Sequence, residues 1–196
     1  MVSDTPFEKA STSGRAVAAA AYKAFQGRRK VLRIHHGEES FTDILRCEDS
    51  PVEGWTSYSS LTLHRSRNLV DGQDISVEIA GVCGNEISGF AEAIADACEA
   101  VRKGNWFAAP EILFADVFGD RIPDTRFPHL LLCPPYPWKG LSRIELPDGG
   151  TVHWLMAFPI SESERQFFLR AGFDQLESIF LERQTEYFDL ARQSEV

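Results

Sequence analysis

Only one stretch of the chain has the composition of a metal site, with His35, His36, Glu38 and Glu39 close together. Histidine and carboxylate side chains are common ligands of zinc. Adjacent residues of a strand point to opposite faces, however, so both histidines cannot bind one ion. No further histidine lies within a few residues to complete a ligand shell. A strand end that leads into a polar turn is the favoured interpretation, and we predict no metal site.

Other residue types that catalyse reactions are present without the arrangement that catalysis needs. Glu145 with Asp148, and Asp116 with Asp120, lack the apolar surroundings that separate two carboxylate pKa values for acid–base work. The chain has no Gly-x-Ser-x-Gly turn and no glycine-rich nucleotide loop. The remaining histidines are isolated along predicted strands, which favours packed or solvated roles: His64, His129 and His153. We therefore predict no catalytic residue, no cofactor and no enzymatic activity.

The composition is that of a globular protein of 196 residues, 43% hydrophobic and 25% charged, which suits one domain with a full core. The formal net charge is −9, which disfavours direct nucleic-acid binding and permits a basic partner. No apolar run approaches the ~20 residues of a membrane span, and the first residues lack the pattern of a signal peptide. Four cysteines without Cys-x-x-Cys spacing favour reduced thiols and a cytoplasmic location: Cys47, Cys83, Cys98 and Cys133.

Two helices are predicted in the first half of the chain. Residues 13–25 favour helix by propensity, and Gly27 is placed to end it. Residues 86–103 have an apolar stripe of helical period, with Asn85 as the expected N-cap and Gly104 at the end. Acidic side chains lie opposite that stripe, so we expect a solvent-exposed acidic face: Glu92, Asp96 and Glu99.

The segment from residue 30 to residue 80 indicates strands. Residues 31–34 and 41–45 flank a Gly-Glu-Glu turn, which predicts a hairpin. Residues 55–64 and 75–79 alternate with a period of two, which is typical of half-buried strands in a mainly antiparallel sheet.

The last third contains three further predicted strands, two of them a hairpin, and two helices. Residues 130–132 are a continuous apolar run, as expected of a strand that is covered on both faces. Residues 142–146 and 151–158 flank an Asp-Gly turn, which predicts a hairpin whose second strand lies in mid-sheet. Ser161 and Glu164 predict a capping box, and Asp174 with Glu177 predict a second helix start of the same kind.

These elements predict an α+β fold, an α/β sandwich in which a mainly antiparallel mixed sheet packs against helices. Residues 1–29 are predicted as an N-terminal helical extension and residues 30–196 as one domain.

Aromatic residues beside turns are the most suggestive feature for binding, because interfaces favour aromatic anchors. Tyr136 and Trp138 lie on a loop that three prolines stiffen, and they are the strongest individual candidates. The alternative, that such residues cap the edges of the core, is favoured for any single one of the set: Trp55, Tyr58, Trp106, Phe107, Tyr136 and Trp138.

An ordered set of motifs from about residue 30 onward resembles the suppressor-of-fused domain, in its bacterial single-domain branch. The set consists of Asp116, His-Leu-Leu-Leu-Cys-Pro-Pro from residue 129, Trp138, Trp-Leu-Met-Ala-Phe-Pro-Ile-Ser from residue 154, Glu164, and Phe-Asp-Leu-Ala-Arg-Gln-Ser from residue 188. The resemblance implies an α/β sandwich without known catalytic activity. Bacterial members are antitoxins or immunity proteins, some against nuclease toxins, whereas an animal relative encloses an extended peptide between two lobes.

The residues and the resemblance together indicate a cytoplasmic immunity protein that neutralises a cognate toxin protein by binding it. Acidic side chains would then complement a basic cleft of the toxin. The candidate partner-binding residues are Tyr136, Trp138, Glu92, Asp96 and Glu99. Two alternatives stay open, namely a peptide-binding adaptor that uses a sheet edge and, less favoured, an unrecognised enzyme.

Overall fold

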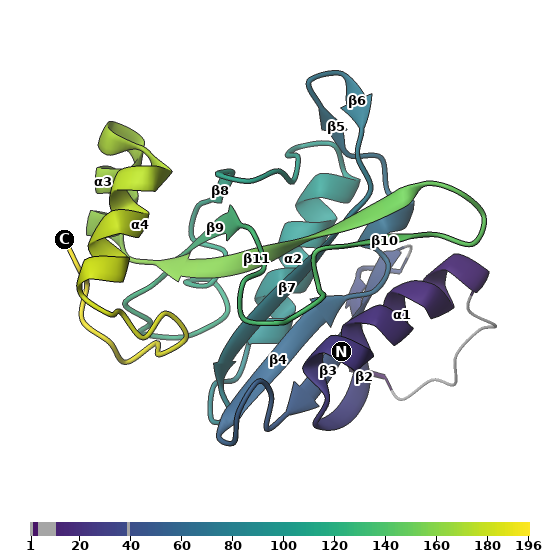
Figure 1. Ribbon diagram of the computed structural model, residues 1–196, viewed down its shortest axis with the longest axis horizontal. Helices are drawn as coiled ribbons and strands as arrows, with labels where there is room; N and C mark the ends of the chain where they lie inside the picture. Colours follow the sequence, from purple (N-terminus) through teal and green to yellow (C-terminus); the bar gives the residue numbers. More distant parts are fainter. Residues whose placement is uncertain (1, 4–10, 39) are drawn as a thin grey trace.

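The computed structural model describes residues 2–3, 11–38 and 40–196. Among these residues, nine strands form one mixed sheet in the order β1-β2-β3-β4-β7-β11-β9-β8, with β10 paired to β11. Every pair is antiparallel except β7 with β11. The remaining two strands, β5 and β6, form a separate hairpin that projects from the sheet (Figure 1). The α+β class and the mainly antiparallel sheet are therefore confirmed.

The strands are β1 Val2–Ser3, β2 Arg28–His36, β3 Ser40–Glu48, β4 Trp55–Ser60, β5 Leu69–Val70, β6 Gln73–Asp74, β7 Val77–Gly84, β8 Leu113–Phe114, β9 His129–Cys133, β10 Arg143–Glu145 and β11 Thr151–Ile160. The helices are α1 Thr12–Phe25, α2 Phe90–Arg102, α3 Glu162–Ala171 and α4 Phe173–Glu182, with a 3-10 turn at Leu63–Arg65.

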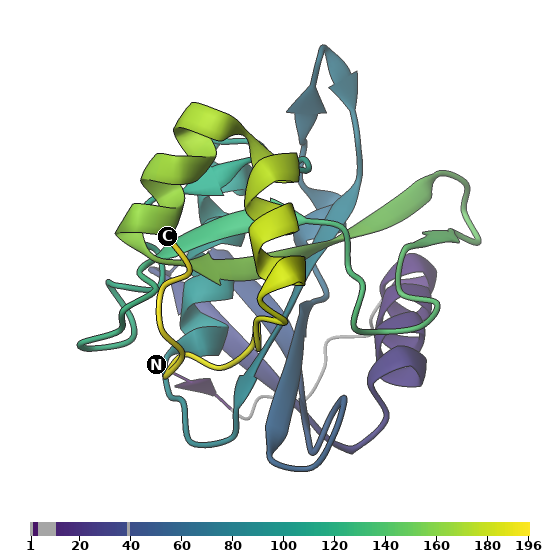
Figure 2. The same cartoon turned by 60° about the vertical axis from the view of Figure 1, so that its left-hand side comes forward.

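Helices cover both faces of the sheet, so there are two cores. Alternate residues of each strand point to opposite faces. Ile79 of β7 accordingly packs with Phe90 and Ile94 of α2 in one core. The neighbouring Ala80 and Val82 belong to the other core, beneath α1 and α4. Figure 2 shows α3 and α4 together at the end of the sheet where β11 finishes, with α1 at the other end.

This layering makes the expectation of half-buried strands wrong. All residues of β7 are buried, as are five of the six in β4, because α2 covers one face and α1 with its neighbours covers the other. The strand predicted for residues 55–64 also ends early, at Ser60. Beyond it the buried Glu78 carboxylate accepts hydrogen bonds from the backbone N–H groups of Leu63 (3.3 Å) and His64 (3.1 Å), which holds them in the 3-10 turn.

Both predicted hairpins form, and β2 and β3 extend well beyond the predicted strands. The strand β11 lies between β7 and β9, in mid-sheet as predicted. All five residues of β9 are buried, which confirms the interpretation of the apolar run. The strand β8 is short, and its two residues pair with Leu131 and Leu130 of β9.

The helix starts were predicted with mixed success. Ser161 and Glu164 form the expected capping box of α3. The helix α2, by contrast, begins at Phe90 after Gly89 rather than next to Asn85. The Asn85 side chain instead accepts a hydrogen bond from Thr56 (2.6 Å) and donates one to Asp49 (3.2 Å). The helix α4 begins at Phe173 with Gly172 as its N-cap, and Asp174 supplies no side-chain cap.

The N-terminal helix packs on the sheet. Val17, Ala21 and Phe25 of α1 are buried in the second core. The strand β1 pairs with β2. The division of the chain at residue 30 stays a prediction.

Candidate partner-binding surface

The acidic face predicted for α2 is not free in the structure. Glu99 is buried, and Glu92 and Asp96 are half-buried. Asp96 accepts two hydrogen bonds from the Arg121 guanidinium, at 2.5 and 2.9 Å. Glu99 forms ion pairs with Arg102 and, at 3.4 Å, with Lys103. The expectation of a solvent-exposed acidic face is therefore wrong, because all three carboxylates belong to buried or half-buried residues. Neighbouring cations also neutralise two of the three.

The pKa of Glu99 reflects this environment. Burial alone would raise the pKa of the carboxyl, but hydrogen bonds from Ser40 (3.0 Å) and Arg102 outweigh burial and hold the pKa below its usual value. The Glu99 carboxylate stays ionised and stays paired. It is a structural anchor between α2 and the β2–β3 hairpin.

The two aromatic candidates on the proline-rich loop lie in different environments. Trp138 is only 3% exposed, contacts Phe25 and donates its indole N–H to the Ser57 hydroxyl at 2.9 Å. It is a core residue, in agreement with the core-capping alternative that the sequence favoured for any single aromatic of the set, and it cannot act as a surface anchor. Tyr136 is 52% exposed and contacts the rings of Tyr187 and Phe188. Of these two residues, Tyr136 is the one that can present its ring to a partner.

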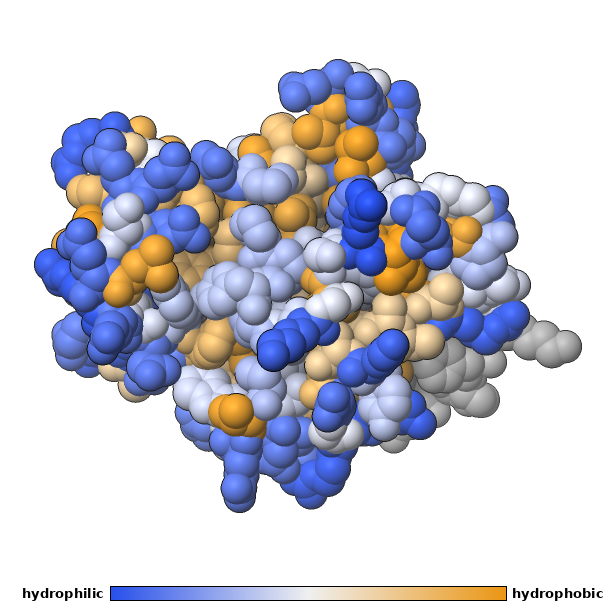
Figure 3. All heavy atoms as spheres, viewed as in Figure 1, coloured by the Kyte–Doolittle hydropathy of each residue, from blue (hydrophilic) through white to orange (hydrophobic). Residues whose placement is uncertain are grey.

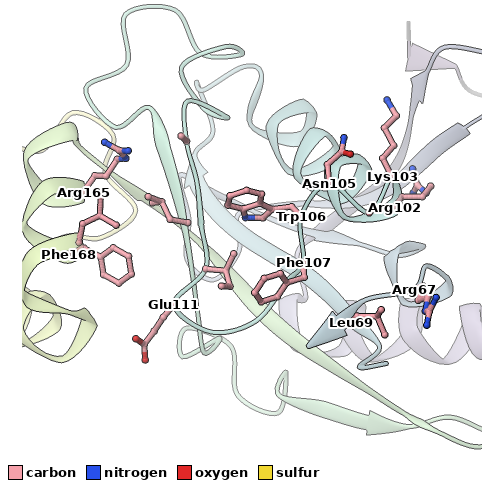
Figure 4. Close-up of a pocket in the computed structure, with 15 residues that line it drawn as sticks. Arg67, Leu69, Arg102, Lys103, Asn105, Trp106, Phe107, Glu111, Arg165 and Phe168 are labelled. Atoms are coloured by element: carbon pink, nitrogen blue, oxygen red, sulfur yellow. The ribbon is translucent and has the colours of Figure 1, made fainter. Parts of the chain in front are cut away.

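A groove lies between α3, the β5–β6 hairpin and the segment that links α2 to β8. Its volume is about 880 Å³. Figure 4 shows Phe168 and Arg165 of α3 on one side, Trp106 and Phe107 in the middle, and Arg67 with Leu69 on the far side. The strand β8, at the end of the sheet order, contributes Leu113. Three segments distant in the sequence thus build one surface.

The groove is rich in exposed apolar side chains. Eight large hydrophobic residues of the described chain are exposed, and four of them line this groove: Leu69 (41%), Trp106 (49%), Phe107 (39%) and Leu169 (61%). On the face shown in Figure 3, apolar colour gathers on the β5–β6 hairpin among other places. Gathered apolar side chains at a surface mark binding sites.

Sequence reasoning had noted Trp106 and Phe107 as aromatics beside a turn but did not select them. The available signal was local: Gly104 is placed to end the predicted helix, and two large aromatics follow it at once. The partners that complete the groove, on α3 and the β5–β6 hairpin, are distant in sequence, so no local pattern pointed to them.

Glu111 is the one carboxylate among the described residues that line the groove. No three His, Cys, Asp or Glu side chains within the described ranges are grouped to hold a metal ion. Glu39, part of the histidine-rich stretch, lies outside those ranges. His64 and His129 are buried and hydrogen-bonded to Glu78 and Glu162, at 2.6 and 2.7 Å. The helices within the described ranges are too short or too polar to cross a membrane.

Comparison with known proteins places this geometry in context. Residues 38–193 match the family described as suppressor of fused protein. Immunity protein YqcF of Bacillus subtilis (strain 168) is 31% identical over 186 residues, which are 93% of this chain and 96% of that protein.

Two solved structures share the fold. A suppressor of fused homologue from Neisseria gonorrhoeae FA 1090 superposes with a TM-score of 0.69 at 17% identity, over 94% of this chain and 97% of that one. A chain of the Sufu–Fu complex gives 0.66 at 13% identity, over 95% and 93%. The sequence match covers most of the chain and the fold agrees, so this protein belongs to the suppressor of fused family.

Proposed function

We propose that this chain is a cytoplasmic immunity protein that neutralises a cognate toxin by binding it. The observation that carries the proposal is the 31% identity to an immunity protein across nearly the full length of both chains. Because the match spans both cores and the groove, the relative's function is a reasonable guide to this one.

The groove is the surface that supports binding best. It gathers exposed aromatic side chains of the kind that anchor interfaces. It also holds no pair of titratable groups arranged for acid–base work among the described residues that line it. The proposed mechanism is therefore occlusion: the immunity protein covers a surface that the toxin needs, and no bond is made or broken.

Rescue in cells tests the proposal. The toxin encoded beside this gene is expressed with and without the immunity protein, and survival is scored together with co-purification of the pair. We expect survival and a stable complex. Growth arrest despite full expression of folded immunity protein, with no complex recovered, would refute the proposed function.

A second candidate function, a peptide-binding adaptor, is favoured by the place of β8. This strand ends the sheet order and its Leu113 lines the groove, so an extended segment in the groove would lie near a sheet edge. Recovery of a non-toxin protein as the stoichiometric partner would distinguish this function from immunity.

A further inference from the structure

We propose that the part of the partner that enters the groove is an acidic segment carrying a large apolar side chain. The inference rests on the proposed function for the existence of a protein partner, and adds the chemistry of the contact. It reverses the expectation from net charge, under which an acidic chain would meet a basic partner.

The charge of the groove differs in sign from that of the whole chain. The chain has 29 acidic and 20 basic residues. Among the described residues, four cations but only one acid, Glu111, line the groove: Arg67, Arg102, Lys103 and Arg165. Arg67 is exposed and forms no ion pair within the described residues, and Lys103 is 61% exposed. A local positive field on a negative molecule selects a negative ligand and speeds its encounter.

Arg165 on α3 has donor capacity that the chain does not use. One terminal nitrogen donates to the Glu162 carboxylate at 3.1 and 3.3 Å. The Nε–H of the same guanidinium is buried and has no hydrogen-bond acceptor among the described residues. An unpaired buried donor is costly, and a guanidinium binds a carboxylate through paired hydrogen bonds. The Arg165 side chain as a whole is 30% exposed and lines the groove, so a carboxylate from a partner can pair with the part of it that solvent reaches.

The apolar part of the groove defines the second requirement. Trp106 and Phe107 line the same groove as Leu69 and Leu169, and all four are exposed in the free protein. A purely ionic ligand would leave them in water. An apolar side chain between flanking carboxylates would bury them and reach the cations at the rim. The volume lies within the ~300–1,000 Å³ of sites for small ligands, so the part of the partner that enters the groove is a short segment.

A single-stranded nucleic acid is the other polyanion that uses aromatic and cationic side chains. Two observations favour the protein segment. Arg102 and Lys103 are already partly neutralised by Glu99, so the positive patch is short and offers few contacts to successive phosphates. The overall charge of −9 opposes a long phosphate backbone that continues past the groove.

A charge variant with a matched control tests the ionic part. The variant Arg67→Glu/Lys103→Gln is compared with Arg126→Glu/Lys139→Gln, in which two exposed cations outside the groove change by the same total charge. Binding of the inactivated toxin is measured at about 0.05 M and about 0.3 M salt. We expect the groove variant to bind at least about 10-fold more weakly at low salt, and the control less than about threefold. Equal effects of the two variants would overturn the proposal.

The apolar part is tested with Trp106→Ala beside Tyr136→Ala, each of which truncates one half-exposed aromatic ring. We expect a loss of about 30-fold for Trp106→Ala, the size of an interface hot spot, and little change for Tyr136→Ala. A larger loss at Tyr136 would move the binding surface to the proline-rich loop and contradict the proposal.

The chemistry of the occupant is then read directly. A photo-crosslinking residue at Leu169, which is well exposed, captures the segment in the complex, and mass spectrometry locates it. An acidic segment with an aromatic or aliphatic residue is expected, and a basic segment would refute the inference.

If the wild type binds no toxin, the proposed function fails and the groove is tested by itself. Short peptides with a Leu-Phe pair flanked by Asp and Glu, by Lys and Arg, or by Ser are compared with an oligothymidine. Selective binding of the acidic peptide, lost in the groove variant, would sustain the inference. No acidic preference, or tighter binding of the oligonucleotide, would end it.

Discussion

Arg192 and Glu164 form a buried ion pair that fastens the C-terminal segment to the start of α3. Glu164 is fully buried, and the Arg192 guanidinium donates to both of its oxygens, at 2.5 and 3.0 Å. The same guanidinium donates to the Pro159 carbonyl oxygen at 3.3 Å and lies over the Phe127 ring, 3.9 Å from its centre. Because α3 also carries Arg165, this pair fixes one wall of the groove.

The substitution Arg192→Met keeps much of the packing against Phe127 and removes the charge. Breaking a buried pair by removing one partner costs about 3–5 kcal/mol, since an uncompensated charge remains. Glu164 would still accept from the backbone N–H groups of Ser161 (2.9 Å) and Glu195 (3.1 Å), which places the loss near the lower end, about 3 kcal/mol. For a chain of this length that corresponds to a fall in Tm of roughly 6–12 °C.

Denaturant unfolding and calorimetry measure the loss, with Arg28→Met as control. The Arg28 side chain is 77% exposed and pairs with Glu48 and Asp49, so its removal should cost less than about 1 kcal/mol. The double variant Arg192→Met/Glu164→Gln should recover part of the loss, because no lone charge is left buried. A cost for Arg192→Met no larger than that of Arg28→Met would refute the reasoning.

Three further predictions follow from burial and backbone geometry. All four cysteines are buried, and burial raises the pKa of the Cys47 thiol to about 11. A disulfide reagent near pH 8 should therefore label the native protein very slowly, and it should label four thiols after unfolding. Rapid labelling of the native protein would contradict this. Gly89→Ala should lower the free energy of unfolding by about 1–3 kcal/mol, because φ is 85° and the new Cβ would meet the Arg121 carbonyl oxygen. Gly104→Ala, where the new Cβ has open space, should cost less in the same unfolding assay. Burial lowers the pKa of His36 in the folded protein below 6.5, so the unfolded chain binds a proton at this histidine more tightly than the folded chain does. The free energy of unfolding should therefore fall as pH decreases from about 6.5 towards the folded-state pKa. His36→Gln should flatten that part of the stability–pH curve, and an unchanged slope would contradict the assignment.

The sequence alone determined the elements whose signals are local. The capping box from Ser161 to Glu164 needs only residues three apart, and the Asp-Gly turn at residues 148 and 149 needs only its own backbone preferences. The apolar run in β9 requires cover on both faces wherever it lies. Family membership also came from the order of such local motifs along the chain.

The tertiary structure alone decided which side chains face a partner. Trp138 and Tyr136 are two residues apart on one loop, yet one is buried against Phe25 and the other is exposed. Asp96 would be a surface acid on an isolated helix, but Arg121 comes from a loop 25 residues away and pairs with it. Side-chain burial and charge pairing depend on contacts between distant segments, which local patterns do not encode. For the same reason the groove, with walls from α3, the β5–β6 hairpin and the end of α2, exists only in the folded chain.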